Sequence, residues 1–295
     1  MIEVLAAGPL TTVQDGGRVG WRTLGVPAAG PADWLSHAIA NRLVGNPDSA
    51  AALECTLAGP RLRFDADTLV AGVGFGAPWT RPVGAGETVA IGRTSGVRGY
   101  VAVAGGIDVP PVLGSRGTDT LSGLGPPKLA AGMRLPTGTG TGTGGGTRRD
   151  PAGPLPAIGE GALRVVAGPH GDWFRGPLPP GPYTVTPASD RVGVRLDGPP
   201  INRVWDRGEL PVTGMVAGAL QVPPDGQPIL LLANHGPTGG YPVIGVVATA
   251  DLPAAGQARP GQELTFEIVP VGVAREAYRT LRAGLDAVLS PVRPG

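Results

Sequence analysis

Polar residues in the loop Asn234–Pro242 are arranged in a way that suits binding of a small molecule. The loop lies between two apolar runs and holds an amide, a histidine, a threonine, two adjacent glycines and a tyrosine. Amide and imidazole groups exchange hydrogen bonds, backbone N–H groups at paired glycines can bind an oxyanion, and an aromatic ring can stack on a flat group. A plain Gly-Gly hairpin would explain the glycines but not the polar residues. We predict proton transfer by His235 and substrate binding by Asn234, Thr238, Gly239, Gly240 and Tyr241.

A second loop combines Asp15, two glycines and Arg18 in the sequence Val13-Gln14-Asp15-Gly16-Gly17-Arg18. The glycines allow a sharp turn that holds both charges at one loop tip. A guanidinium fork matches a carboxylate or phosphate, and a neighbouring carboxylate can orient the ligand or accept a proton. We predict a catalytic role for Asp15 and substrate binding by Arg18. The alternative is a purely structural Asp/Arg brace of the turn.

Two further loops offer charged groups for ligand binding. Asp33 follows Gly30-Pro31-Ala32 at the start of a predicted helix, where an acid is favourable even without a ligand. Arg116 lies in Gly114-Ser115-Arg116-Gly117, beside a hydroxyl, on a loop that follows an apolar run. Loops on a rigid scaffold often carry binding groups. We include Asp33 and Arg116 among the candidate substrate-binding residues, with a solvated turn as the alternative for Arg116.

Several common chemistries lack their usual motifs. The histidines His37, His170 and His235 show no metal-ligand spacing, so we expect no metal site. The only lysine, Lys128, lies between prolines and leucine, outside any P-loop. The G-x-G-x-x-G match at Gly140, Gly142 and Gly145 has no strand before it and no helix after it, so low complexity explains it better. Cys55, inside an apolar run, is predicted to be a buried core residue.

Short runs of Val, Leu, Ile and Thr, separated by Gly and Pro, indicate an all-β protein with a few short helices. Helical periodicity appears only in Pro31–Val44 and Ala274–Leu289. The predicted strands are Glu3–Leu5, Leu62–Phe64, Thr68–Ala71, Thr88–Ile91, Gly99–Val103, Leu163–Val166, Tyr183–Thr186, Gly193–Leu196, Ala219–Val222, Ile229–Leu232, Val243–Thr249 and Glu263–Val269.

Length and composition indicate two domains in a soluble protein. We predict an N-terminal β domain with one helix over residues 1–136, a Gly/Thr/Pro-rich linker over 137–156, and a C-terminal β domain with a terminal helix over 157–295. The net charge of +1 favours neither nucleic acid nor a membrane surface as partner. A single cysteine, the lack of a signal-peptide pattern and the shortness of the apolar runs favour a cytoplasmic location.

Ordered motifs along nearly the whole chain resemble the family that comprises the C subunit of 5-oxoprolinase, KipA and allophanate hydrolase subunit 2, which is related to biotin-dependent carboxyltransferases. The motifs that carry the resemblance are Val13–Arg18, Ala40–Asn46, Arg98–Ile107, Gly114–Arg116, Ser189–Leu196, Gly218–Pro224 and Thr238–Pro242. The chain departs from the family pattern at Asn234, where an acid is usual, and at Gly236, where glutamine is usual. Because an amide cannot take up a proton at neutral pH, a base has to come from His235 or Asp15.

The resemblance implies cyclophilin-like β-barrel domains and a hydrolase that acts on a cyclic amide only with partner subunits. The implied partners are a KipI-like protein, similar to the B subunit of 5-oxoprolinase, and a protein of lactam-hydrolase type, similar to the A subunit. The implied reaction is the ATP-dependent opening of 5-oxo-L-proline to L-glutamate. Because the sequence has no P-loop, ATP binding would be shared with the partners or unconventional.

Two alternative functions remain open at the level of sequence. In a biotin-dependent carboxyltransferase of the urea carboxylase type, Tyr241 would flank the biotin ring, and a separate protein would carry the biotin because no attachment motif occurs here. In a KipA-like regulatory binder, the chain would bind an inhibitor of a sensor kinase and have no activity of its own.

Overall fold

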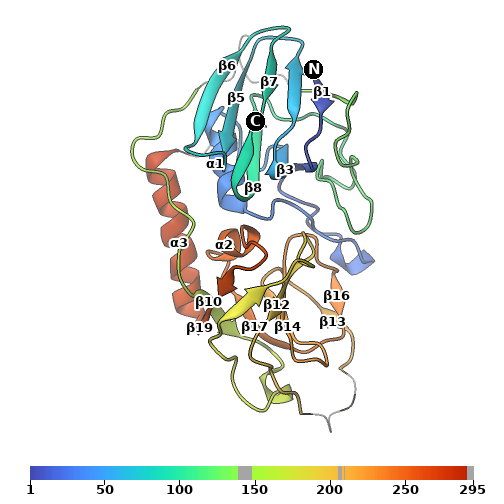
Figure 1. Ribbon diagram of the computed structural model, residues 1–295, viewed down its shortest axis with the longest axis vertical. Helices are drawn as coiled ribbons and strands as arrows, with labels where there is room; N and C mark the ends of the chain where they lie inside the picture. The colour runs from blue at the N-terminus through green and yellow to red at the C-terminus, as the bar shows by residue number, and fades with distance from the viewer. Residues whose placement is uncertain (139–147, 205–207, 209, 291–295) are drawn as a thin grey trace. The chain divides into compact units, whose positions relative to one another are not determined.

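The computed structural model describes residues 1–138, 148–204, 208 and 210–290 of the chain (Figure 1). The glycines of the G-x-G-x-x-G match and much of the predicted linker 137–156 lie outside the described residues. The chain divides into two compact units. The first comprises Met1–Val19, Ala29–Pro156 and Ala283–Gly295, and the second comprises Gly20–Ala28 and Ala157–Arg282.

The first unit is built from two antiparallel sheets that enclose a common apolar core. One sheet has five strands in the order β2-β3-β8-β5-β6, and the other has four in the order β7-β4-β1-β9. Ile2 and Leu62 from the smaller sheet and Leu53 and Val101 from the larger one are fully buried in the same cluster. The strands are β1 (Ile2–Ala6), β2 (Leu10–Gln14), β3 (Ala52–Ala58), β4 (Arg61–Phe64), β5 (Thr68–Val73), β6 (Trp79–Val83), β7 (Thr88–Ala90), β8 (Arg93–Val103) and β9 (Arg134–Leu135).

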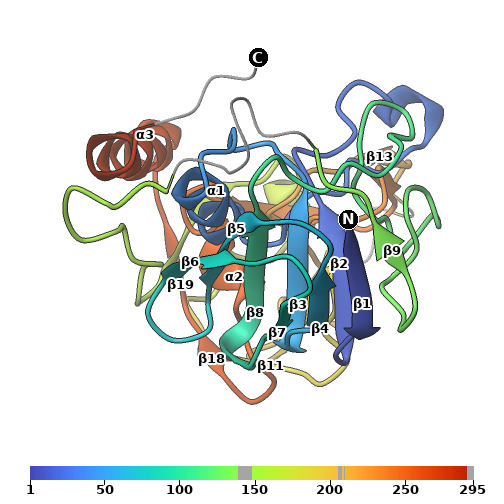
Figure 2. The ribbon, with the colours of Figure 1, turned by 90° about the horizontal axis from the view of Figure 1, so that it is seen from above.

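Helix α1 (Trp34–Leu43) covers the five-stranded sheet on the side of β8 and β5 (Figure 2). It begins three residues later than the predicted Pro31, because the side chain of Asp33 caps it by accepting a hydrogen bond from Ser36 N at 3.0 Å. Residues 35–43 are all buried, polar ones included. The helix is therefore surrounded by protein and is not an amphipathic surface helix.

The second unit is a β-barrel of eight strands in the order β18-β11-β12-β15-β14-β17-β10-β19. Only Thr265 separates β18 from β19, so the two ends of this order are consecutive in the chain and the barrel is nearly closed. Its interior is filled by Val165, Tyr183, Leu220 and other buried apolar side chains. The strands are β10 (Leu163–Ala167), β11 (Tyr183–Val185), β12 (Gly193–Asp197), β14 (Ala219–Gln221), β15 (Ile229–Leu231), β17 (Val243–Val247), β18 (Glu263–Leu264) and β19 (Phe266–Ile268).

Short elements complete the two units. Strands β13 (Thr213–Gly214) and β16 (Thr238–Gly239) form a separate two-stranded ladder in the second unit. Helix α2 (Leu252–Gly256) also belongs to this unit, whereas α3 (Val271–Val288) contributes residues to both. Single turns of 3₁₀ helix occur at Arg22–Leu24 and Gly171–Trp173.

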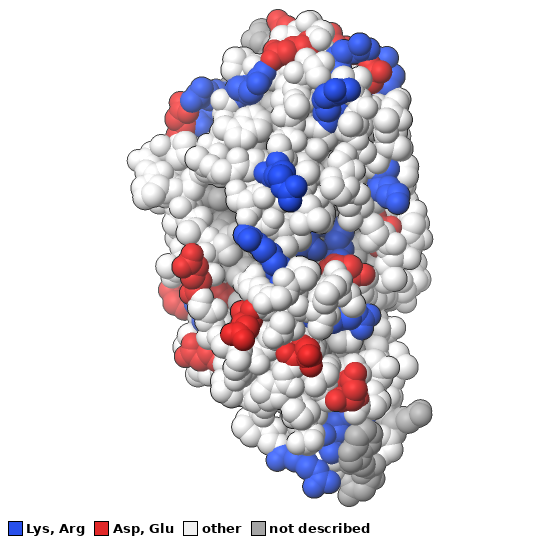
Figure 3. Space-filling view, in the orientation of Figure 1, with Lys and Arg blue, Asp and Glu red and all other residues white. Residues whose placement is uncertain are grey.

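The predicted all-β class with few helices is confirmed, and each predicted strand overlaps an observed one. The sequence reasoning missed β2, β3, β6, α2 and the two-residue strands β9, β13 and β16. Cys55 is buried as predicted, and burial raises the pKa of its thiol to about 12. Within the described residues, no helix is long and apolar enough to cross a membrane. Lys and Arg side chains are dispersed over the face drawn in Figure 3 and form no continuous basic stripe there.

A buried arginine holds together three segments of the first unit. Arg42 on α1 is fully buried and forms a bidentate pair with Asp48, at 2.6 Å from Nε and 2.8 Å from Nη2. Its Nη1 donates to Asp286 at 2.7 Å and to the carbonyl oxygen of Leu289 at 2.6 Å. The guanidinium therefore links α1, the following loop and the end of α3.

We expect Arg42→Met to lower the free energy of unfolding by about 3 kcal/mol, because it leaves two carboxylates and a carbonyl without their donor. The matched control is Arg63→Met, which breaks the exposed Arg63–Glu3 pair and should cost less than about 1 kcal/mol. Urea denaturation of the three proteins measures both values. Equal destabilisation by the two substitutions would contradict a structural role for the Arg42 cluster.

Candidate functional site

Asp15 is held at the end of β2 by three hydrogen bonds to its carboxylate. Its Oδ1 accepts from Gly17 N at 2.9 Å and from the Ser115 hydroxyl at 2.6 Å, and its Oδ2 accepts from Arg116 N at 2.6 Å. Gly17 has a φ of 82°, a conformation that favours glycine and allows this tight turn. The carboxylate therefore joins two of the predicted site loops, 15–18 and 114–117, which are about a hundred residues apart in sequence.

Arg18 is fully buried and also connects the same two loops. Its Nε donates to the carbonyl oxygen of Val112 at 3.2 Å, and its Nη2 donates to that of Gly117 at 2.5 Å. Its Nη1 has no hydrogen-bond partner among the residues that the structure describes. The Asp/Arg brace considered from sequence is thus present, and one donor of Arg18 remains for a further acceptor.

Arg116 and Asp33, the other candidates in this unit, face different surroundings. The Arg116 side chain donates to Asp108 at 2.6 Å near the surface, so only its backbone N–H takes part in the Asp15 cluster. Asp33 is fully buried and caps α1. Its carboxylate occupies the helix N-terminus, where an anionic ligand would otherwise bind.

A buried polar network beside this cluster was missed by the sequence reasoning. Glu54 accepts from the Tyr100 hydroxyl at 2.8 Å and from Ala32 N at 2.9 Å, and its other oxygen lies 3.5 Å from Arg98 Nε. The ring of His37 meets Tyr100 edge-on, with 5.8 Å between centroids. The available clue was a charged residue, Glu54, inside an apolar strand, since buried carboxylates are nearly always paired.

His37 reaches from α1 to the end of β2, directly beside the Asp15 turn. Its Nε2 lies 3.0 Å from the carbonyl oxygen of Gln14, which indicates that Nε2 carries a proton. Burial lowers the pKa of His37, and the hydrogen bond to Gln14 and the nearby Asp15 oppose this shift only in part. His37 is therefore a neutral hydrogen-bond donor that fixes the backbone before Asp15.

The Gly-rich loop of the second unit is not a hairpin. Strands β15 and β17 on either side of it are both paired with β14, and not with each other. Thr238 and Gly239 instead pair with Gly214 and Thr213 in the β13/β16 ladder. A Cβ on Gly239 would lie 2.4 Å from Gln221 Nε2 and 3.2 Å from Met215 Cε, so the backbone of Gly239 packs closely against these two side chains.

Gly240 and Tyr241 form the exposed end of this loop. Among the described residues, no heavy atom comes closer than 3.9 Å to the position of a Cβ on Gly240, and Tyr241 is 44% exposed. The backbone here is accessible to a ligand, with an aromatic ring beside it. Of the predicted binding residues in this loop, Thr238, Gly240 and Tyr241 are exposed, whereas Asn234 is buried.

Asn234 lies beneath the loop and is fully buried. Its Oδ1 accepts from Arg191 at 3.2 Å from Nε and 2.9 Å from Nη2. Burial lowers the pKa of Arg191 to about 10. The Asn234 amide thus holds the buried Arg191 guanidinium in place. A carboxylate at position 234 would form an ion pair with Arg191 instead.

His235 is also buried, and its Nδ1 lies 2.7 Å from the carbonyl oxygen of Leu232. Burial lowers the pKa of His235 and the nearby Arg22 lowers it further, against hydrogen bonding to the backbone of Leu232 and Met215. Arg22 itself donates to the carbonyl oxygen of Met215 at 3.0 Å. Arg22 was missed by the sequence reasoning, since nothing local shows that residues 20–28 pack with the second unit.

The candidate residues therefore fall into two groups, one in each unit. Asp15, Arg18 and the backbone of Arg116 form the first group. Met215 connects the second group, because its backbone contacts Pro237 and Arg22 and its sulfur accepts from Gln221 at 3.2 Å. The second group consists of Arg22, Gln221, Asn234, His235 and the loop Thr238–Tyr241.

The lowered pKa values of His37 and His235 predict a loss of stability in acid. Below the unfolded-state pKa of about 6.5, the unfolded chain binds protons that the folded protein excludes, so the free energy of unfolding falls as pH decreases. We expect His37→Gln, which keeps a donor for Gln14, to make this decline less steep between about pH 6.5 and 5. We expect His235→Gln to make the decline in the free energy of unfolding less steep over the same pH range.

Urea denaturation at several pH values measures the difference in slope between each variant and the unsubstituted protein. At about pH 7.5 the histidines are neutral in both states, so values there report only the change in packing. Parallel pH dependences of variant and unsubstituted protein would show that the two histidines titrate normally.

Comparison with protein families gives one match that covers most of the chain. The family model described as carboxyltransferase domain, subdomain A and B, matches residues 24–268. The C subunit of 5-oxoprolinase from Escherichia coli (strain K12) is 37% identical over 288 residues, which cover 90% of each chain. The C subunit of 5-oxoprolinase from Haemophilus influenzae is 32% identical over 98% of this chain and 97% of that protein.

Larger fungal proteins contain a similar region. The urea amidolyase of Lachancea kluyveri is 33% identical over 99% of this chain, but the match spans only 18% of that protein. The crystal structure of the K. lactis urea amidolyase superposes with a TM-score of 0.88 at 30% identity, over 100% of this chain and 20% of that one. The chain thus spans about a fifth of these urea amidolyases. With its two β units, it belongs to the family of carboxyltransferase domains with subdomains A and B, and its predicted relationship to the C subunit of 5-oxoprolinase is confirmed.

Proposed function

We propose that this chain is the C subunit of an ATP-dependent 5-oxoprolinase and that it opens 5-oxo-L-proline to L-glutamate together with partner subunits. The observation that carries this proposal is the 37% identity to the C subunit from E. coli over 90% of both chains. The subunit designation of that relative supports an assembly in which this chain acts only with other proteins. We further propose a KipI-like B subunit and a lactam-hydrolase-like A subunit as these partners.

The open end of the Gly-rich loop suits the lactam chemistry of this reaction. Transfer of a phosphoryl group from ATP to the lactam oxygen would release ADP and activate the ring carbon for attack by water. The C–N bond would then break as the ring nitrogen takes up a proton, and a second water would release phosphate from the resulting acyl phosphate to leave glutamate. Negative charge develops on the acyl oxygen during this second attack, and preorganised N–H groups stabilise such charge. In our proposal the Gly239-Gly240 backbone supplies these donors and Tyr241 lies against the flat ring.

Arg22 would bind the carboxylate of 5-oxoproline. Its Nη1 is anchored to the Met215 carbonyl at 3.0 Å, and Arg22 is an exposed residue. A guanidinium with one anchored nitrogen can still form a two-pronged contact with a carboxylate through its remaining N–H groups. Met215 would thus connect the substrate-binding cation to the Gly-rich loop.

Asp15 has the geometry of a residue that positions the loop 115–117. Both of its oxygens already accept hydrogen bonds from the loop 115–117 or from Gly17. Arg18 holds the same loop through its hydrogen bonds to the carbonyl oxygens of Val112 and Gly117. In our proposal the pair keeps the loop ready for the ligand.

The described residues do not fit the phosphates of ATP. The N-terminus of α1 is occupied by the buried Asp33 carboxylate, and Lys128 lies in an irregular segment that leads into no helix. A P-loop needs a glycine-rich turn at a free helix N-terminus with a lysine beside it. We therefore assign the nucleotide to the partner subunits and derive no step through it on this chain.

A biotin-dependent carboxyltransferase is the second candidate, favoured by the superposition on urea amidolyase with a TM-score of 0.88. In that case the open Gly240-Tyr241 backbone and ring would face the ureido group of carboxybiotin on a separate carrier protein. The same loop could serve both reactions, because a lactam and a ureido group are both flat cyclic amides.

Co-expression of this chain with its partner subunits provides the test. We expect ATP hydrolysis that depends on 5-oxoproline and releases glutamate, and we expect neither activity when this chain is omitted. Release of bicarbonate from carboxybiotin by the chain, without turnover of 5-oxoproline by the assembled complex, would favour the carboxyltransferase instead.

Two substitutions distinguish whether Asp15 transfers a proton or only positions the loop. If Asp15 transfers a proton, Asp15→Asn should lower kcat of the complex by about 10² to 10⁴, whereas Ser115→Ala, which removes one of its hydrogen bonds, should cost about fivefold. If Asp15 only positions the loop, the two losses should be similar. Asp65→Asn, at an exposed ion pair with Arg134, is the control and should leave turnover unchanged.

For Arg22 we expect a selective effect on substrate binding. Arg22→Gln removes a charged hydrogen bond to the substrate carboxylate and should raise KM for 5-oxoproline about tenfold, with a smaller change in kcat. Arg175→Gln, another exposed arginine of the second unit, is the matched control. An unchanged KM for Arg22→Gln would exclude the carboxylate contact.

A further inference from the structure

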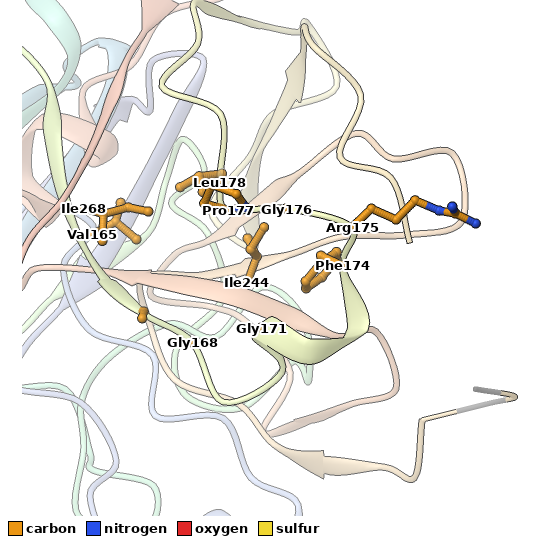
Figure 4. Close-up of a pocket in the computed structure, with 11 residues that line it drawn as sticks. Val165, Gly168, Gly171, Phe174, Arg175, Gly176, Pro177, Leu178, Ile244 and Ile268 are labelled. Carbon is orange, nitrogen blue, oxygen red and sulfur yellow. The ribbon is translucent and has the colours of Figure 1, made fainter. Parts of the chain in front are cut away.

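A cavity of about 300 Å³ opens into the barrel of the second unit (Figure 4). It is lined by the apolar side chains of Val165, Phe174, Leu178, Ile244 and Ile268, together with glycines of the segment 168–176. Val165 and Ile268 are paired across β10 and β19, and Ile244 lies on β17. The cavity is therefore at the mouth of the barrel, with the segment 171–178 forming its outer wall.

The walls of this cavity are well ordered by backbone hydrogen bonds. Gly168 N donates to the carbonyl oxygen of Ile244 at 2.9 Å, and His170 Nδ1 accepts from Val243 N at 3.1 Å. A Cβ on Gly168 would come within 2.4 Å of the Val243 carbonyl oxygen, so glycine allows the close approach of the two strands. The wall is thus attached to β17 directly after the Gly-rich loop.

The chemistry of the lining is apolar. Val165, Phe174, Leu178 and Ile244 are each less than a tenth exposed, and Ile268 at the rim is 51% exposed. The one charged residue at the cavity, Arg175, directs its side chain away from the other lining residues in Figure 4. A ligand that binds in this cavity would therefore replace its contacts with water by apolar contacts and would form no ion pair there.

We propose that this barrel mouth is a binding site for a compact, neutral, ring-containing molecule of about ten non-hydrogen atoms. Its volume is about twice the ~150 Å³ of an apolar protein cavity that holds benzene, and it lies at the lower end of the range of ligand pockets. Mouths of β-barrels are common places for such sites. None of its lining residues belongs to the two groups of candidate residues described above, so this site does not depend on the proposed function.

The probe for this site is 5-fluoroindole, observed by ¹⁹F NMR in a titration of the full chain. We expect saturable binding that Ile268→Glu weakens by at least about tenfold, because a carboxylate at the rim must lose water when the ring enters. The matched control is Val273→Glu, at a residue 49% exposed that does not line the cavity, and it should bind like the unsubstituted protein. Both substituted residues are half-exposed, so folding should be retained, and thermal denaturation checks it.

A second pair of variants fills the cavity without adding charge. In the part of the chain that the structure describes, neither Gly171, at the cavity, nor Gly159, away from it, has a heavy atom within 4 Å of a Cβ position, and neither has a positive φ. We expect Gly171→Leu to weaken 5-fluoroindole binding by at least about tenfold and Gly159→Leu to have no effect. Absence of saturable binding to the unsubstituted chain, or equal binding by all five proteins, would overturn the proposal.

Discussion

The carboxylate of Asp15 is the constraint on which the arrangement of the first unit's loops depends. Ser115 and Arg116 could hydrogen-bond to water equally well, and only a buried anion at the end of β2 draws the loop onto the turn 15–18. Arg18 completes the arrangement by binding two carbonyl oxygens of the same loop. Hydrogen bonds to charged groups are stronger than neutral ones, so the two residues together can order a loop that has no regular secondary structure.

In the second unit, close packing and not a charged group holds the Gly-rich loop in place. Gly239 packs closely against Gln221 and Met215 and pairs with Thr213, and these contacts hold the loop before Tyr241. Because Gly239 packs closely against its neighbours, the loop is ordered while the backbone of the next residue, Gly240, stays accessible. In our proposal this loop binds a lactam or a ureido group, and relatives of the chain are named for 5-oxoprolinase and for urea amidolyase.

The fold was predictable where local pattern and burial agree. Short apolar runs bounded by glycine and proline identified most long strands, and the capping residue Asp33 lies one residue before the observed α1. Strands β2 and β3 were missed because Thr11, Thr12 and Glu54 are polar yet buried, and only tertiary partners such as Tyr100 make that burial possible. The candidate loops were found from residue types, but the pairing of Asp15 with Ser115 and of Arg22 with Met215 joins distant segments that no local signal connects.

The order of strands in the barrel ends on two very short strands, β18 and β19, which are joined by Thr265. Each has only one neighbour in the sheet, but strands of two and three residues offer few unpaired backbone groups to another chain. In the described part of the first unit, the edge strands β2 and β6 are five residues long. Addition of a strand by a partner protein is therefore favoured at the first unit, and contacts to the barrel are expected mainly through side chains and loops.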